Sequence, residues 1–231
     1  MLENMEHRGG QGAEPTSGDG AGILVQIPHK FLTAEVGELG FMLPAPGTYG
    51  VGNTFFPKED NLRAKCLVEL EKYIANFKLN LLGYREVPVN NESLGKSAKD
   101  SEPAHIQFFV APKEAMDEDT LERKMVVLRK YANRTIHQLF PSTYDSFYIS
   151  SLSCRTLIYK GQLTTEQLQQ YFLDLQRDTF ESALALVHSR FSTNTTPKWK
   201  LAQPFRYIAH NGEINTIAGN GIRGNVGDGM P

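Results

Sequence analysis

The stretch "AHIQFFVAPKEAMDEDTLERKMVVLRKYANRTIHQL" (Ala104–Leu139) decides the fold, because it places a buried strand directly before a strong amphipathic helix. Its first part, 104–112, is mostly apolar, which predicts a strand covered by other elements. Residues 118–139 show apolar positions at helical spacing, and the acids from Asp117 to Asp119 favour the dipole of the first turn. The apolar stripe of this helix consists of Leu121, Met125, Leu128, Ala132, Ile136 and Leu139.

Further elements follow on both sides of this stretch. Periodicity predicts an amphipathic helix over 58–79 and short helices over 29–39 and 164–172, the last one with Thr164 or Thr165 as N-cap of a capping box. Strands are predicted over 22–28, 48–56, 82–89, 146–153, 154–161, 182–191 and 205–210.

Within this pattern the near-continuous apolar run 182–191 indicates a central strand covered on both faces, with the alternating run 205–210 beside it. The polar segment 90–103 indicates a loop. Because strands and helices do not alternate one for one, we expect an α+β fold with helices packed on mainly antiparallel sheets.

The composition indicates an intracellular protein that binds a small molecule or another protein. The chain of 231 residues carries a formal net charge of -2 with both signs mixed, so nothing favours nucleic acid. No signal peptide and no run of the ~18 apolar residues of a membrane span is present, so we expect a cytoplasmic protein of one domain. The cysteines Cys66 and Cys154 lie far apart without CxxC spacing, so neither a disulfide framework nor a zinc site is expected.

Three clusters combine glycine with polar side chains next to predicted strands: "HRGG" with "SGDGAG", "HSRFSTNT" and "AHNGEIN". The glycines of the first cluster precede a strand, which excludes a dinucleotide fingerprint and leaves a tight turn as the simple alternative. In the third, Asn211 and Gly212 form either a hairpin turn or an oxyanion hole, in which an amide and a backbone N–H face a developing negative charge. His188 and His210 are more simply structural residues than metal ligands. Arg190 ends an apolar run and needs an anionic partner, which is Glu213, Asp19 or a ligand carboxylate.

Together, "LVHSRFSTNT", "AQPFRYIAHNGEINT" and "NMEHRGGQGAEPTSGDGAGILVQIPH" resemble the amino-terminal glutamine amidotransferase domain of the glutamate synthase large subunit. That domain is a class II member of the N-terminal nucleophile hydrolases. The resemblance covers essentially the whole chain to Asn220 and includes "FYISSLSCRTLIYKG". It implies a four-layer αββα sandwich, and hydrolysis of the glutamine side-chain amide to glutamate and ammonia for transfer to 2-oxoglutarate.

The resemblance also implies a role for individual residues. Asn211 and Gly212 match the oxyanion hole, and Arg190 matches the arginine that holds the α-carboxylate of glutamine, with Thr193 and Asn194 lining the same pocket. A guanidinium suits that carboxylate because it can bind both oxygens at once. The residues that match supporting positions are Arg8, Asp19, His188 and His210.

The family's nucleophile is a cysteine at the mature N-terminus, and no cysteine precedes "HRGG" in this sequence. We therefore expect a single partial domain over 1–231, with the nucleophile strand missing upstream, a divergent tail at 221–231, and no activity of the fragment by itself. Cys154 has no α-amine to act as its base and lies in a predicted strand, so it is not expected to replace the nucleophile.

Two other hypotheses remain besides an enzyme domain: a nucleophile-free module that binds glutamine or docks on a synthase, and a scaffold in which the clusters are only turns. For the enzyme, the resemblance implies no metal or cofactor in this domain, but FMN and an iron-sulfur cluster elsewhere in the full-length protein. It implies as partners the remaining synthase domains and a small electron-transfer subunit, with NADPH, NADH or ferredoxin as electron donor. It also implies a plastid location if the source is a photosynthetic eukaryote.

Overall fold

The computed structural model describes residues 17–189 and 196–210. The strands are β1 (Ala21–Gln26), β2 (Gly50–Phe56), β3 (Leu79–Glu86), β4 (Ala104–Pro112), β5 (Tyr148–Ser153), β6 (Thr156–Gly161) and β7 (Ala185–Ser189). The α-helices are α1 (His29–Glu38), α2 (Asp60–Asn76), α3 (Lys96–Asp100), α4 (Glu118–Leu139) and α5 (Thr165–Tyr171). Short 3-10 helices are η2 (Pro141–Thr143), η3 (Leu173–Gln176) and η4 (Trp199–Leu201). The tail predicted at 221–231 lies outside the described residues.

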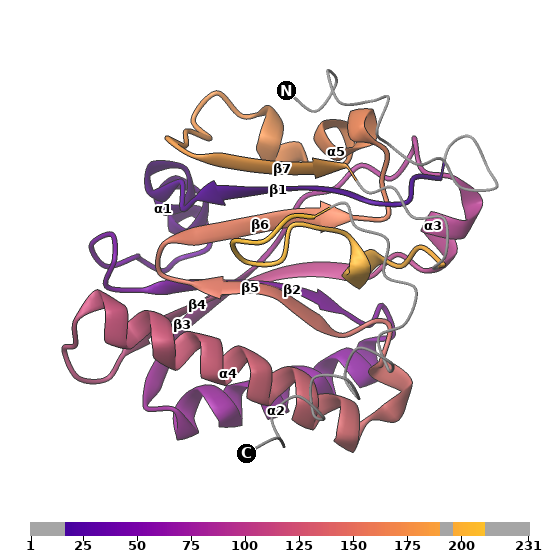
Figure 1. The fold of residues 1–231 in the computed structure, drawn as a ribbon. Coiled ribbons are helices and arrows are strands. Elements are labelled where there is room, and N and C mark those ends of the chain that lie inside the picture. Colours follow the sequence, from indigo (N-terminus) through magenta and orange to yellow (C-terminus); the bar gives the residue numbers. More distant parts are fainter. Residues whose placement is uncertain (1–16, 190–195, 211–231) are drawn as a thin grey trace, which may run out of the picture.

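The described strands form two sheets in which every pair is antiparallel. The three-stranded sheet has the order β6-β1-β7, and the four-stranded sheet has the order β3-β4-β2-β5. Figure 1 shows the smaller sheet above the larger one, with β6 next to β5. At this junction the N–H of Ile158 donates to Ser151 Oγ at 3.2 Å, and Asn53 Nδ2 donates to the carbonyl of Ile158 at 2.7 Å. The two sheets are therefore joined through β5 and β6.

Helices α2 and α4 cover one face of the four-stranded sheet (Figure 1). Neighbouring side chains on a strand point to opposite faces, which divides the apolar residues of β2 and β4 between two cores. Phe56 and Phe108 pack against the helices, whereas Phe55 and Phe109 belong to the other core. A Cβ at Gly52 would lie 2.0 Å from the ring of Phe108, so glycine leaves the space that this ring occupies.

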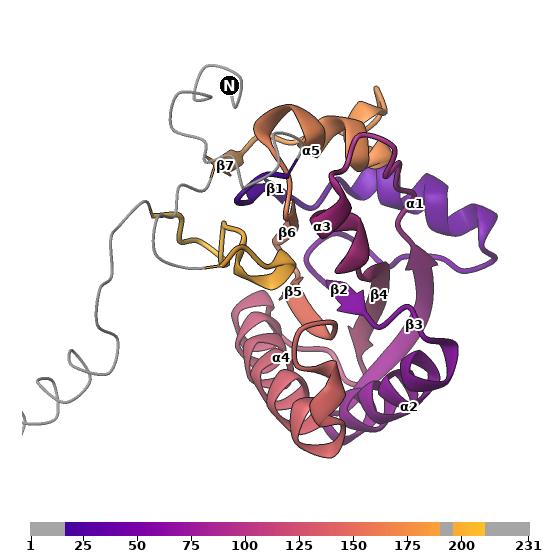
Figure 2. The ribbon, with the colours of Figure 1, turned by 90° about the vertical axis from the view of Figure 1, so that its right-hand side faces the viewer.

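The second core joins both sheets to α1, α5 and the indole of Trp199. Figure 2 shows α1 and α5 on the side of the strands opposite to α2 and α4. Antiparallel sheets with helical layers on either side confirm the α+β class and the four-layer αββα sandwich expected from the sequence. Among the described residues, no helix combines the length and the apolar character that a membrane span requires.

The helix predictions are confirmed closely. Helix α4 has the predicted bounds, and the carboxylate of Asp117 caps it by accepting the N–H of Thr120 at 2.9 Å. Thr164 is the N-cap of α5: its hydroxyl accepts the N–H of Gln167 at 3.3 Å, and Gln167 Oε1 accepts the N–H of Thr164 at 2.9 Å. This reciprocal pair is the predicted capping box.

Three predictions about individual segments are wrong. The segment 90–103 is not only a loop, since it contains α3, whose Ala98 is buried and accepts the indole N–H of Trp199 at 3.1 Å. This contact joins residues about one hundred positions apart, so the polar composition could not reveal it. The strand in 182–191 is not covered on both faces as predicted, because Ala185 at the start of β7 is exposed and Leu186 and Val187 are only half-buried.

The segment 205–210 forms a tight turn rather than a strand beside β7. Phe205 and Ile208 exchange backbone hydrogen bonds at 2.7 and 2.9 Å, and Arg206 between them has φ 50. The apolar side chains of Tyr207 and Ile208 are exposed, so their alternation does not mark a buried sheet face. A four-residue turn and a short strand give the same alternation, and only the backbone conformation distinguishes them.

Candidate functional site

Part of the predicted site lies within the described structure. Asp19, His188 and His210 are described there, whereas the other predicted site residues lie outside the described residues: Arg8, Arg190, Thr193, Asn194, Asn211 and Gly212. The structure therefore shows the elements that lead into the predicted pocket, and the roles of these residues stay predictions.

The described parts of the first two clusters, residues 17–22 and 188–189, lie at one end of the strand pair β1 and β7. Because β1 and β7 are antiparallel, the beginning of β1 lies next to the end of β7: Gly22 is opposite His188, and Ala21 is opposite Ser189. Asp19 precedes β1 and is buried, as is His188. The sheet thus brings the described end of the glycine loop next to His188 and Ser189, with which the "HSRFSTNT" cluster begins.

The segment leading to the third cluster packs against β1 and β6. A Cβ at Gly22 would lie 2.2 Å from the carbonyl oxygen of Gln203, so only glycine allows this close approach. Gly20 has φ +141, and a Cβ there would lie 3.0 Å from Cβ of Ala202. Gly20 and Gly22 are therefore packing positions for residues 202 and 203, whereas a Cβ at Gly18 would lie 2.1 Å from the carbonyl oxygen of Leu163. The segment that leads to the third cluster thus packs against the start of β1.

Lys160 on β6 holds this segment against the sheet, and sequence reasoning missed it. Its buried ammonium donates to the carbonyls of Ala202 at 2.8 Å and Lys200 at 3.1 Å, and it lies 3.9 Å from the ring centre of Phe205. Burial lowers the pKa of Lys160 well below its ordinary value. A lysine inside the apolar strand pattern "TLIYKG" was the available signal, since a buried cation needs specific partners.

His210 ends the described part of the third cluster. The residue is exposed, but the side-chain amide of Gln203 forms hydrogen bonds with both its N–H and its carbonyl. The Nε2 group of Gln203 donates to the carbonyl of His210 at 2.7 Å, and the N–H of His210 donates to Gln203 Oε1 at 2.6 Å. Sequence reasoning did not single out Gln203, because its partner His210 lies in the segment 205–210, which the sequence predicted to be a strand.

The two cysteines do not have the surroundings of a nucleophile. Both are buried, and burial raises the pKa of Cys66 to about 11. Burial, together with a hydrogen bond to the nearby carboxylate of Glu122, raises the pKa of Cys154 to about 12. A thiol in such a place is protonated at neutral pH and inert, as the sequence predicted for Cys154.

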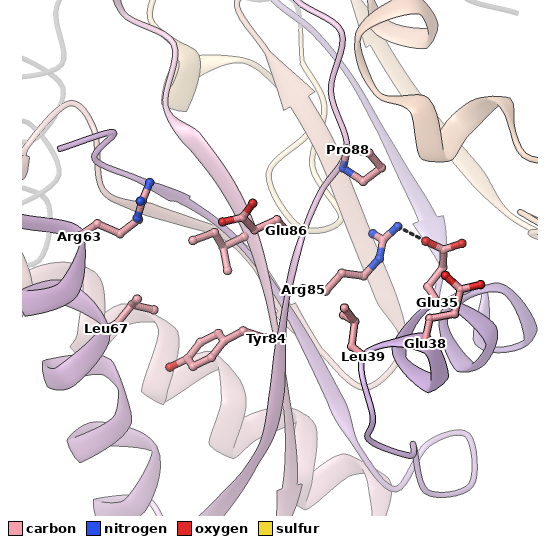
Figure 3. Close-up of a pocket in the computed structure, with 10 residues that line it drawn as sticks. Glu35, Glu38, Leu39, Arg63, Leu67, Tyr84, Arg85, Glu86 and Pro88 are labelled. Atoms are coloured by element: carbon pink, nitrogen blue, oxygen red, sulfur yellow. Dashed lines mark hydrogen bonds and ion pairs between the residues drawn. The ribbon is translucent and has the colours of Figure 1, made fainter. Parts of the chain in front are cut away.

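A separate pocket of about 630 Å³ lies over β3 between α1 and α2 (Figure 3). Of its two arginines, Arg63 pairs with Asp60, and Arg85 is already neutralised, since its NH2 donates to Glu35 at 2.6 Å and to Asp174 at 2.8 Å. None of the predicted site residues lines this pocket. Within ranges 17–189 and 196–210, no three His, Cys, Asp or Glu side chains gather as a metal-binding group.

Comparisons with known proteins agree with this geometry. A family described as "Glutamine amidotransferases class-II" matches residues 1–225. The glutamate synthase [NADH] of Schizosaccharomyces pombe is 42% identical over 226 residues, which are 95% of this chain and 10% of that protein. The glutamate synthase [NADPH] large chain of Bacillus subtilis is 45% identical over 222 residues, covering 95% of this chain and 14% of the relative.

A third relative, the ferredoxin-dependent glutamate synthase 2 of Synechocystis, is 40% identical over 216 residues, or 94% of this chain and 13% of its own length. The chain thus spans between one tenth and one seventh of the relatives that it matches. The family match extends over nearly all of the 231 residues and includes the three clusters. This chain belongs to the class II glutamine amidotransferases.

Proposed function

We propose that this chain is the glutaminase domain of a glutamate synthase, which hydrolyses the side-chain amide of glutamine to glutamate and ammonia. The observation that carries the proposal lies at β1, where Gly22 is opposite His188 and lies against the carbonyl of Gln203, so the described ends of the segments that lead to the three clusters come together. In this proposal the three clusters line one pocket that binds both ends of glutamine. The three relatives, which match over 94 to 95% of this chain at 40 to 45% identity, are glutamate synthases, which supports the same assignment.

In this proposal Arg190 binds the α-carboxylate of glutamine, and Thr193 and Asn194 line the pocket. Attack of a thiolate on the amide carbon develops negative charge on the amide oxygen, which Asn211 and Gly212 stabilise. Losing one such donor typically costs about 3 kcal/mol of barrier. Ammonia then leaves, and water hydrolyses the thioester to release glutamate and regenerate the thiol. Arg8, Asp19, His188 and His210 support these groups.

The nucleophile of the proposed reaction is not one of the two cysteines present, since Cys66 and Cys154 are both buried. We therefore assign it to a cysteine outside the 231 residues and expect the chain by itself to bind glutamine without hydrolysing it. The burial of both cysteines also favours the second candidate function, a nucleophile-free glutamine-binding or docking module.

The remaining functions of a synthase belong to other parts of the larger polypeptide in this proposal. They comprise the binding of FMN and an iron-sulfur cluster, the transfer of ammonia to 2-oxoglutarate, and contact with an electron-transfer partner. The names of the three relatives contain NADH, NADPH and ferredoxin, respectively, so no single electron donor is proposed. A cytoplasmic location is proposed, with a plastid location for a photosynthetic eukaryote, since a chloroplastic relative from rice is 40% identical.

Calorimetric titration of the chain with glutamine tests the binding step. We expect saturable heat at millimolar glutamine or below, and loss of binding by about 30-fold or more in Arg190→Ala, because a charge-assisted contact is worth about 2 kcal/mol or more. Arg134→Ala is the matched control, since Arg134 is exposed on α4. No heat at millimolar glutamine, or equal binding by Arg190→Ala, would overturn the proposal.

Ammonia release distinguishes the two candidate functions. The complete polypeptide with an N-terminal cysteine is expected to release ammonia from glutamine, and replacing that cysteine by serine is expected to abolish the release. Glutamine binding without release from a folded complete polypeptide would favour the binding module instead.

A further inference from the structure

Strand β3 forms an open edge of the four-stranded sheet. Among the described strands it pairs only with β4, so the backbone groups of alternate residues point away from β4. The strand is eight residues long and contains no proline, and the charge of Arg85 is turned inwards to Asp174. An edge of this kind is a template for pairing with a further strand.

The surroundings of β3 leave room for such a strand. Helices α1 and α2 flank β3 on either side, and the pocket of about 630 Å³ described above lies over it (Figure 3). Apolar side chains line this pocket: Leu39, which is 54% exposed, and the half-buried Leu67 and Tyr84. A strand added to β3 would cover these side chains, and burial of their apolar surface would favour the contact.

The hydrogen bonds at both ends of β3 indicate which residues face outwards. The carbonyl of Lys78 accepts from the N–H of Lys113, and the N–H of Val87 donates to the carbonyl of His105, so these positions bond on the β4 side. Bonded and non-bonded positions alternate along an antiparallel ladder, and the irregularity after Leu81 shifts the alternation by one residue. The residues whose backbone groups face outwards are therefore Leu79, Leu81, Tyr84 and Glu86.

These four positions are complementary to themselves. When two β3 strands run antiparallel with Leu81 of one copy opposite Tyr84 of the other, Leu79 lies opposite Glu86, and outward-facing residues meet only outward-facing residues. The irregular segment 82–83 then lies opposite the same segment of the second copy, as a twofold axis requires. Leu81 and Tyr84 both pack on the side of α2, so they form the same apolar cross-strand pair twice.

Charges at the two ends of β3 favour the same arrangement. Lys78 precedes the strand, Glu86 ends it, and both are exposed. In the antiparallel arrangement, Glu86 of one copy comes next to Lys78 of the other on both sides of the axis. Asn80 lies opposite Arg85, so no like charges meet along the ladder.

We propose that β3 is a dimerisation edge, which pairs antiparallel with β3 of a second copy of this chain and joins the two four-stranded sheets. The contact is independent of the proposed function, because none of its residues belongs to the predicted glutamine site.

Sedimentation equilibrium and amide hydrogen exchange of the 231-residue chain test the contact. The mean particle mass is expected to rise with concentration from 25.8 kDa towards twice this value, and exchange of the N–H groups of Leu81 and Tyr84 is expected to slow in parallel. A mass of 25.8 kDa at every soluble concentration would overturn the proposal. Dimerisation without slower exchange at these two residues would also overturn it, since the dimer would then use another surface.

A charge exchange tests the antiparallel arrangement. Glu86→Lys brings two lysines together at each end of the ladder and is expected to raise the Kd of the dimer at least about tenfold at low salt. The double variant Glu86→Lys/Lys78→Glu restores opposite charges and is expected to recover most of this loss. Glu166→Lys is the matched control, since Glu166 is exposed on α5, away from the four-stranded sheet. Equal Kd values for the parent and Glu86→Lys, or no recovery in the double variant, would overturn the arrangement.

Disulfide formation between two different variants tests the register. Residues that form a hydrogen-bonded antiparallel pair have Cα atoms about 5.5 Å apart, a separation that suits a disulfide. An equimolar mixture of Leu81→Cys and Tyr84→Cys chains is therefore expected to form a linked dimer on mild oxidation, whereas the native Cys66 and Cys154 are buried. In the control mixture Tyr131→Cys, at an exposed position on α4, replaces Tyr84→Cys. A linked yield no higher than that of the control would overturn the proposed pairing.

Discussion

The buried ion pair between Arg85 on β3 and Asp174 on η3 is expected to be the most sensitive polar contact in the described core. The guanidinium donates from NH1 and from NH2 to the two carboxylate oxygens, both at 2.8 Å. The side chains are only 4% and 1% exposed. Arg85 also donates to Gln107 at 3.1 Å, and Tyr159 donates its hydroxyl to Asp174 at 2.7 Å.

Arg85→Met removes both guanidinium donors to Asp174 and leaves the hydroxyl of Tyr159 as a donor. The carboxylate of Asp174 then has no cation beside it in this contact and little access to water. Breaking a buried pair from one side typically costs about 3 to 5 kcal/mol, because the remaining charge is uncompensated. With a urea dependence of about 3 kcal/mol per M for a chain of this size, the unfolding midpoint should fall by about 1 to 2 M. The double variant Arg85→Met/Asp174→Asn removes that charge and should recover at least half of the loss.

Urea unfolding followed by circular dichroism measures these free energies. Arg63→Met is the matched control, since Arg63 pairs on the surface with Asp60, whose side chain is 89% exposed, and should cost less than about 1 kcal/mol. If Arg85→Met also costs less than about 1 kcal/mol, or if the double variant is no more stable than the single one, the reasoning about an uncompensated buried charge is refuted.

Three further predictions concern other buried groups and one helix cap. Burial lowers the pKa of His105 from 6.5 to about 3, so stability from its neutral form is complete above pH 6.5 and is lost below it by up to about 1.4 kcal/mol per pH unit. Urea unfolding of the parent and of His105→Phe between pH 7 and 4 checks this, and equal slopes would contradict it. Cys66 and Cys154, with pKa values raised by burial to about 11 and 12, should resist iodoacetamide at pH 8 until urea unfolds the chain, and rapid labelling of the folded chain would count against their burial. Thr164→Ala should destabilise the fold by about 1 kcal/mol through loss of the α5 cap, and Thr164→Ser should restore most of it.

The sequence by itself determined the elements whose signals are local. Helix α4, strand β4 and the cap at Thr164 follow from periodicity and capping chemistry within about twenty residues, and the structure has them as predicted. The motifs of the three clusters likewise indicated the family that the comparisons show. Local signals suffice in these cases because the residues that make the contacts are also neighbours in the chain.

Tertiary structure decided what depends on contacts between distant segments. The partial exposure of β7, the helix α3 beneath Trp199 and the turn at 205–208 depend on which surfaces become buried, and a local pattern does not contain that information. The same holds for Lys160 and Gln203, whose partners are carbonyl oxygens and a backbone N–H rather than side chains of a recognisable type. Almost every residue carries the same backbone N–H and carbonyl groups, so a sequence does not show which of them will take part in a site. A site built partly from backbone groups therefore becomes visible only when the chain is folded.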